Sequence, residues 1–257
     1  KLELPWSETE ADVTDSGLRY DLTVPLSRFY SNNANDLPSP FKALQIGSVW
    51  RADQPQRGRF RQFVQCDIDI LGEAGCLAEI ELILATTTLL GRLDFSDFKV
   101  RINERRILKA MASYSGFAED QFDTVFIILD KMDKIGWDGV KKELAEAGFE
   151  QEKVDRYVSM FLEMESAPDS LRYLEETLGG ILEDGVIGNL RTIRESVEAT
   201  RACEFELVFD PTLVRGMSYY TGTIFEIEMA QFGSSVAGGG RYDKMIGKFT
   251  GNDVPAC

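Results

Sequence analysis

The sequence contains no histidine, and this absence excludes several kinds of active site at once. A zinc site with histidine ligands, a Ser-His-Asp triad and a Cys-His nucleophile pair cannot be built from this chain alone. Any catalysis must therefore rely on carboxylates, arginines, tyrosines, backbone amides or a bound metal. We assign no metal site to the protein side chains.

Long apolar runs and paired cysteines are also missing. No stretch approaches the ~18–20 apolar residues of a membrane span, and residues 1–10 lack the apolar core of a secretory signal. We therefore expect a cytoplasmic protein without a membrane partner. The four cysteines form no CxxC motif and are interpreted as reduced thiols: Cys66, Cys76, Cys203 and Cys257.

The charge balance is acidic, with 28 basic and 43 acidic residues. A net charge of −15 argues against a passive nucleic-acid coat, although a local basic groove is compatible with it. The 257 residues, of which 44% are apolar, suffice for one large domain or two modest ones with a buried core.

Strand-like segments at both ends enclose a helical middle. Residues 41–50 and 60–71 are predicted to form an antiparallel hairpin with a long tip, and residues 78–90 an apolar helix. Further strands are predicted at 204–209, at 219–229 and in the run that ends at 238–240. The pattern indicates an α+β fold with one mainly antiparallel sheet. It divides the chain into residues 1–103, a helical insertion at 104–202, and residues 203–257.

The segment 60–71 has two chemically different faces, because side chains alternate along a strand. One face, which we expect to join the core, carries Phe60, Gln62, Val64, Cys66, Ile68 and Ile70. The other carries Arg61, Phe63, Gln65, Asp67 and Asp69. This polar face is either solvated or the floor of a site for a cationic small molecule, with Asp69 and Gln65 holding an ammonium group.

Three other groups of residues each allow a structural or a functional interpretation. Asp21 is either an acid at a helix N-terminus or a site residue. The glycines in 215–222 and 238–243 mark turns or a close approach of another backbone, or else the tyrosines beside them form a pocket wall, since tyrosine combines a flat face with a hydroxyl. Four arginines within eleven residues suit a polyphosphate or form a solvated hairpin tip: Arg51, Arg57, Arg59 and Arg61.

Five segments occur in a characteristic order: LRYDLTVPLSR (18–28), RADQPQRGRFRQFVQCDIDILG (51–72), KVRINERRIL (99–108), LVRGMSYYTGTIFE (213–226) and GGGRYD (238–243). Together they resemble the catalytic domain of the histidyl-tRNA synthetases, which are class II aminoacyl-tRNA synthetases. The resemblance implies a class II-like, mainly antiparallel sheet flanked by helices, with an inserted helical module. It also implies a ligase that activates L-histidine with ATP and Mg²⁺ and transfers it to tRNA(His).

The resemblance further implies a role for each matching residue. Arg51 and Arg215 would be catalytic, and both would bind ATP together with Arg59. The α-ammonium group of histidine would be held by four side chains and its imidazole lined by two tyrosines: Asp21, Thr23, Gln65 and Asp69 for the former, Tyr220 and Tyr242 for the latter. No protein nucleophile is needed, so the lack of histidine does not obstruct this mechanism.

The chain departs from the family pattern in places. Asp21 and Asp69 stand where many members carry glutamate, and Met217-Ser218 replaces a usual Leu-Asp pair. Motif 1, motif 3 and an anticodon-binding domain are not recognised. We therefore expect a homodimer through a segment not in this chain, and poor or no histidine activation by these 257 residues alone.

Two relatives without synthetase activity are the rival interpretations. One is the regulatory subunit of ATP phosphoribosyltransferase in histidine biosynthesis, and the other is a synthetase-like domain of a kinase-type sensor. The regulatory subunits generally erode the Arg-Gly-x-x-Tyr-Tyr signature and lack a full helical insertion, and this sequence keeps both. The intact Arg51, Gln65 and Arg215 argue against the sensor domain. The synthetase interpretation is therefore favoured, with the insertion at 104–202 contacting the tRNA acceptor arm.

Overall fold

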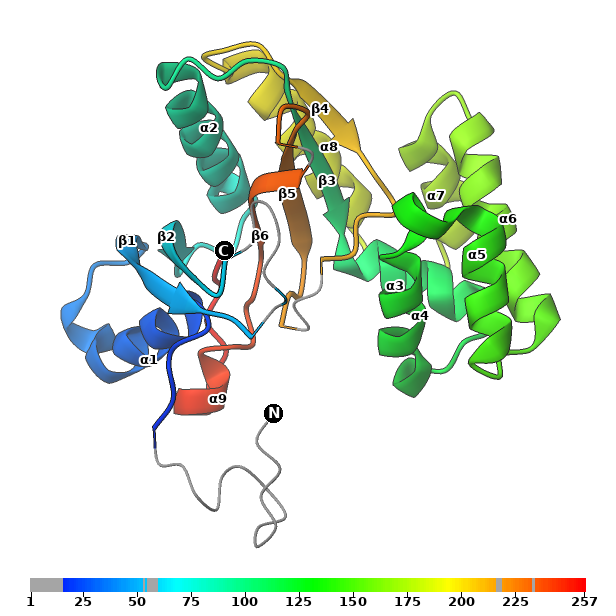
Figure 1. Ribbon diagram of the computed structural model, residues 1–257, viewed down its shortest axis with the longest axis horizontal. Coiled ribbons are helices and arrows are strands. Elements are labelled where there is room, and N and C mark those ends of the chain that lie inside the picture. The colour runs from blue at the N-terminus through cyan, green and yellow to red at the C-terminus, as the bar shows by residue number, and fades with distance from the viewer. Residues whose placement is uncertain (1–15, 53, 55–59, 216–218, 233) are drawn as a thin grey trace, which may run out of the picture.

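The computed structural model describes residues 16–52, 54, 60–215, 219–232 and 234–257 (Figure 1). The strands in these ranges are β1 (Phe41–Trp50), β2 (Gln62–Leu71), β3 (Phe98–Glu104), β4 (Glu206–Phe209), β5 (Thr223–Met229) and β6 (Ser234–Gly240). The α-helices are α1 (Thr23–Asn33), α2 (Leu77–Arg92), α3 (Arg105–Tyr114), α4 (Phe122–Leu129), α5 (Met132–Glu146), α6 (Gln151–Ser166), α7 (Ser170–Leu178), α8 (Val186–Thr200) and α9 (Gly247–Thr250). Two short 3-10 turns, η2 (Ala34–Asp36) and η3 (Glu119–Gln121), complete the elements.

The predicted hairpin is confirmed. β1 and β2 pair antiparallel in one continuous register, from Phe41 opposite Leu71 to Trp50 opposite Gln62. The register places Gly47 opposite Gln65. The hairpin tip includes residues 53 and 55–59, which lie outside the described residues.

The expected core face of β2 is wrong over the outer half of the strand. Phe60 and Val64 are 66% and 62% exposed, and Cys66 is exposed as well, whereas Ile70 is buried. The polar face turns inward instead, and Asp69 is 5% exposed. The alternation along a strand shows which side chains share a face. Which of the two faces is buried depends on segments that are distant in the sequence and pack against it.

The other strands form a four-stranded sheet in the order β4-β3-β5-β6. β3 and β4 run parallel, and the remaining pairs are antiparallel. A parallel pair needs a long crossover, which the helices α3 to α8 provide. In the described residues the strands thus form two sheets rather than the one predicted.

The C-terminal residues join the hairpin to the four-stranded sheet. Ala256 bridges to Leu71, and Cys257 exchanges backbone hydrogen bonds with Ile70 (N to O 2.9 and 3.0 Å). The Tyr242 N–H, just after β6, donates to the Ala256 carbonyl (2.7 Å). This strap holds the inner end of β2 next to the end of β6.

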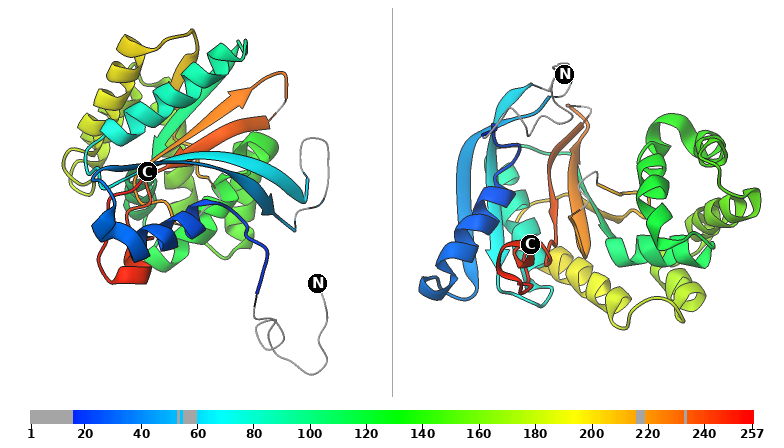
Figure 2. Two further views of the ribbon diagram at one scale, coloured as in Figure 1. Left: turned by 90° about the vertical axis from the view of Figure 1, so that its left-hand side faces the viewer. Right: turned by 90° about the horizontal axis from the view of Figure 1, so that it is seen from below.

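The helices occupy two places around the sheets. α2 and α8 pack on each other, and α8 packs on β3, so they lie beside the four-stranded sheet (Figures 1 and 2). Helices α3 to α7 form a bundle on the side of that sheet opposite the hairpin (Figure 2, right). The bundle has its own interior, and Tyr157 and Phe161 of α6 are fully buried there. No helix in the described ranges is long and apolar enough to cross a membrane.

Candidate functional site

Three carboxylates converge on the inner face of the hairpin. Asp67 and Asp69 lie on β2 and Asp21 lies just before α1; Asp21 and Asp69 are each 5% exposed. Burial raises the pKa of Asp69 to about 6; a hydrogen bond from Tyr242 opposes this shift, and the charges of Asp67 and Asp21 add to it. Burial and the charge of Asp21 also raise the pKa of Asp67. Three carboxylates that lie close together and are shielded from water attract a cation.

The start of α1 positions two of the predicted site residues. The Asp21 carboxylate accepts a hydrogen bond from the Val24 N–H (3.2 Å), so the interpretation of Asp21 as a helix N-terminal acid is confirmed. The same carboxylate also acts electrostatically on Asp67 and Asp69. The side chain of Thr23, the first helical residue, shares a hydrogen bond with that of Tyr219.

Gln65 adds an unsatisfied acceptor to this face. It shares the inner face of β2 with Asp67 and Asp69, by the alternation of the strand. Its Oε1 atom is buried and has no hydrogen-bond partner among the described residues. A buried acceptor without a donor is unfavourable, so an ammonium group held among these side chains would satisfy it.

Three tyrosines adjoin the carboxylates on the side of the four-stranded sheet. The Tyr242 hydroxyl donates to Asp69 (Oη to Oδ1 2.7 Å). The Tyr219 ring lies between the others, with its centroid 4.8 Å from that of Tyr220 and 6.1 Å from that of Tyr242. Such a wall offers flat apolar surface and hydroxyls to a planar polar ligand.

Arg51 borders the acid cluster at the outer end of β1. Its guanidinium carbon lies 4.5 Å from the ring centroid of Tyr20 and 4.9 Å from that of Phe63. Its charge lowers the pKa of Asp67, against the effect of burial. A guanidinium held between two rings has a restricted orientation, which suits the oxygens of a carboxylate or phosphate.

Arg215 lies between β4 and β5 in the sequence, and its side chain borders the tyrosines on the side of the four-stranded sheet. Its backbone φ of 59° lies in the left-handed region, which is rare for residues other than glycine and frequent at functional sites. Its Nη1 atom donates to Glu226 Oε2 at 2.6 Å, and its side chain also shares a hydrogen bond with Tyr220. The guanidinium is thus held between the sheet and the tyrosine wall.

The structure brings most of the predicted site residues together. Arg51 contacts the cluster electrostatically through Asp67, and Arg215 contacts it through Tyr220. Arg59, predicted to bind ATP, lies outside the described residues, as do Arg57 and residues 216–218. The residues grouped around the carboxylates and tyrosines are Asp21, Thr23, Gln65, Asp69, Tyr220 and Tyr242.

Sequence reasoning gave no role to three residues that the structure places here. Asp67 was already on the polar face of β2, so the alternation contained its signal. Tyr219 stood beside Tyr220 in the sequence, but only the geometry shows it at the centre of the tyrosines. Glu226 ends the resembling segment 213–226, but only the geometry shows that it pairs with Arg215.

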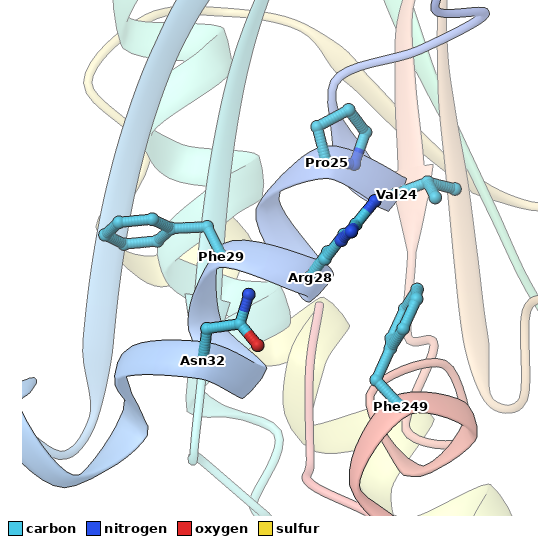
Figure 3. Close-up of a pocket in the computed structure, with 6 residues that line it drawn as sticks. All are labelled: Val24, Pro25, Arg28, Phe29, Asn32 and Phe249. Atoms are coloured by element: carbon cyan, nitrogen blue, oxygen red, sulfur yellow. The ribbon is translucent and has the colours of Figure 1, made fainter. Parts of the chain in front are cut away.

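A separate surface hollow of about 470 Å³ lies between α1 and α9 (Figure 3). It contains none of the predicted site residues; its lining is Val24, Pro25, Arg28, Phe29, Asn32 and Phe249.

The described residues do not contain a group of three or more cysteine, aspartate or glutamate side chains placed to hold a metal ion.

Comparison with known proteins gives one consistent result. The family model for histidyl-tRNA synthetase matches residues 13–257. The histidine–tRNA ligase of Leifsonia xyli is 49% identical to this protein over 95% of the chain. That of Korarchaeum cryptofilum is 40% identical over 93% of the chain. The chain spans only 58% and 54% of the length of these two relatives.

Two solved structures resemble the fold. A histidyl-tRNA synthetase from Nostoc sp. PCC 7120 has a TM-score of 0.78 and 27% identity, over 93% of this chain and 56% of that one. A Bacillus halodurans protein, described as an ATP phosphoribosyltransferase regulatory subunit/histidyl-tRNA synthetase, has a TM-score of 0.75 and 24% identity, over 93% of this chain and 60% of that one. The second likeness extends to the fold alone.

Proposed function

The chain belongs to the histidyl-tRNA synthetase family, and from that premise we propose that it carries the active site of a histidine–tRNA ligase. The ligase would activate L-histidine with ATP and transfer the histidyl group to tRNA(His). The observation that carries this proposal is the buried carboxylate cluster facing three tyrosines, because it suits a small cation with a planar ring.

The amino acid is proposed to bind between the hairpin and the tyrosines. Its α-ammonium group would be held by Asp21, Thr23, Gln65 and Asp69. The buried Oε1 atom of Gln65, which has no partner in the described part of the chain, supports this, since an ammonium donor would satisfy it. The imidazole ring would lie against Tyr220 and Tyr242.

ATP is proposed to bind where Arg51 and Arg215 border this cluster, with Arg59 as a further contact. Mg²⁺ would arrive as part of the ATP substrate. In the reaction, a carboxylate oxygen of histidine attacks the α-phosphorus and the bond to pyrophosphate breaks, which leaves histidyl-adenylate. A hydroxyl at the tRNA 3′ end then takes the acyl group and releases AMP.

The two arginines would act by electrostatics and positioning. Arg51 would bridge the substrate carboxylate and the α-phosphate, and so hold the reacting atoms close together. Arg215 would stabilise the negative charge that grows on the phosphoryl oxygens in the transition state. No protein side chain needs to form a covalent bond in this scheme.

We further propose the organisation and partners of the whole protein. Residues 1–103 and 203–257 would form the catalytic core, and the insertion at 104–202 would contact the tRNA acceptor arm. The protein would work as a homodimer in the cytoplasm. These assignments follow the family resemblance.

A non-catalytic role in the regulation of histidine biosynthesis is the second candidate. The Bacillus halodurans protein, which shares the fold, is named for both roles. The Arg215–Glu226 contact and the intact tyrosines favour the ligase, since a protein that only binds histidine needs no arginine held for a phosphate.

Amino-acid-dependent ATP–pyrophosphate exchange by the full-length protein tests the proposal. Across all twenty amino acids, exchange is expected with histidine alone, and Arg215→Ala should reduce it at least 100-fold, as for the loss of a transition-state donor. No exchange with any amino acid, together with measurable histidine binding, would reject the ligase in favour of the regulatory role.

A further inference from the structure

The guanidinium of Arg215 rests on a pair of facing residues in strands β5 and β6. Glu226 of β5 and Gly238 of β6 are cross-strand partners, so their side-chain positions project from the same face of the sheet. Glu226 Oε2 lies 2.6 Å from Arg215 Nη1. A Cβ atom on Gly238 would lie 2.6, 2.8 and 3.0 Å from Nη1, Cζ and Nη2 of Arg215.

Those three short distances mean that the guanidinium plane occupies the space above Gly238. Any larger residue there would force the end of Arg215 to move, because real Cβ contacts are not shorter than about 3.0 Å. The displaced atoms belong to the flexible end of a side chain, so the backbone can stay where it is. The sheet therefore reserves this space for the arginine.

A second arginine lies opposite Glu226 on the neighbouring strand. Arg101 of β3 faces it directly in the antiparallel register. Burial lowers the pKa of Arg101, but Asp210, Asp133 and Glu226 together raise it above the ordinary value. Arg101 in turn donates to Asp210 (Nε to Oδ2 2.5 Å). Charges of alternating sign thus cross the sheet from Asp210 through Arg101 and Glu226 to Arg215.

We propose that Glu226 and Gly238 are positioning residues that set the direction of the Arg215 guanidinium for the adenylation step. This inference rests on the proposed function. Glu226 fixes one edge of the guanidinium by a charge-assisted hydrogen bond, and Gly238 lets its plane lie on the sheet. Neither residue needs to touch the substrates. The arginine remains partly accessible, with 23% of its side chain exposed, so it can still meet a phosphate.

Kinetics of histidine activation by the full-length protein provide the test. Glu226→Gln and Gly238→Ala are each expected to lower kcat about 10- to 100-fold, within the range for disturbed transition-state contacts, while the KM for histidine stays within about twofold. Glu228→Gln is the matched control, because Glu228 lies on the same face of the same strand, has a side chain that is 48% exposed and pairs with Arg101 (4.0 Å) rather than with Arg215, so it also tests whether a disturbance of Arg101 alone matters. It should keep the kcat of the unmodified protein.

The Arg215→Ala background separates positioning from a general structural effect. Each substitution should have no further effect on kcat there, because the group it positions is gone. A further loss of similar size in that background would overturn the inference, and so would an unchanged kcat in the single variants. A Gly238→Ala protein with a lowered thermal midpoint in both backgrounds would also overturn it.

The outcome can be distinguished from a failure of the proposed function. If the unmodified protein shows no histidine-dependent exchange, the ligase assignment fails before any variant is compared. If the unmodified protein does exchange, but Glu226→Gln and Gly238→Ala keep its kcat as Glu228→Gln does, the ligase assignment stands and the positioning role is rejected.

Discussion

At the scale of single residues, the site is defined by charges that are unfavourable in the absence of a ligand. Asp69 is 5% exposed and close to two other carboxylates, and these effects outweigh the hydrogen bond from Tyr242, which favours the ionised form. Its ionised form is therefore destabilised in the folded protein. The same property prepares the carboxylate to bind a cation, since an arriving positive charge relieves the repulsion.

The stability of the protein should reflect this burden on Asp69. Its folded-state pKa of about 6 stands above the ordinary 3.8, so the folded form binds the proton more tightly and loses stability as the pH rises from about 4 to 6. Asp69→Asn should therefore stabilise the ligand-free protein by about 1–3 kcal/mol at pH 8, about half as much at pH 5, and not at all below pH 4.

Urea unfolding of the full-length protein at several pH values measures this change. Asp138→Asn serves as the control, because Asp138 is exposed on α5 and its replacement should have no pH-dependent effect. A gain that is equal at pH 5 and pH 8 would contradict the ionisation argument. Histidine binding should weaken in the Asp69→Asn protein at the same time.

At the scale of elements, the sequence predicts which strands pair better than it predicts which face of a strand is buried. The hairpin and helix α2 were expected close to their observed bounds, because alternation and apolar spacing are local signals. The core face of β2 was predicted wrongly over the outer half of the strand, since local alternation does not show which segments cover a face; Tyr242, which contacts Asp69, lies 173 residues later. The role of Gly238 was equally hidden: it depends on Arg215, which reaches the sheet from another segment.

A buried ion pair fixes α2 to the end of β6. Arg241 donates from Nε and Nη2 to the two carboxylate oxygens of Glu79 (2.6 and 2.7 Å), and the two side chains are 8% and 2% exposed. Removing one member leaves a buried charge, so Glu79→Ala should lower the free energy of unfolding by about 3 kcal/mol or more.

The same helix offers a matched control for this prediction. Glu81, two residues further on, pairs with Lys42 at 2.6 Å, but the two side chains are 50% and 55% exposed. Water and salt screen such a pair, so Glu81→Ala should change the free energy of unfolding by less than about 1 kcal/mol. Equal effects of the two substitutions in chemical denaturation would refute the distinction between buried and exposed pairs here.

At the scale of the whole molecule, helices α3 to α8 separate β3 in the sequence from β4 and β5, its neighbours in the sheet. The sequence predicted helices between strand-rich ends, because mixed-charge helical patterns interrupt those ends, and helices α3 to α8 lie there. It could not show how the returning chain docks. That depends on Asn103, at the end of β3, which donates from Nδ2 to the carbonyls of Pro211 (3.1 Å) and Leu213 (2.8 Å), more than a hundred residues later.

Asn103 is fully buried, and it joins the exit from the sheet to the loop that carries Arg215. Asn103→Ala would leave two carbonyls without their donor and open a small cavity, so it should lower the free energy of unfolding by about 2–4 kcal/mol. Because the loop also positions Arg215, kcat for histidine activation should fall while the protein is still folded.

Thermal unfolding and exchange kinetics below the transition together measure both effects of Asn103→Ala. Asn189→Ala, at an exposed position on α8, is the control and should alter neither quantity. A loss of stability with full activity would mean that the loop places Arg215 correctly without the hydrogen bonds from Asn103. The docking of the returning chain would then serve the fold alone, and the geometry of the arginine would depend only on its contacts with Tyr220, Glu226 and Gly238.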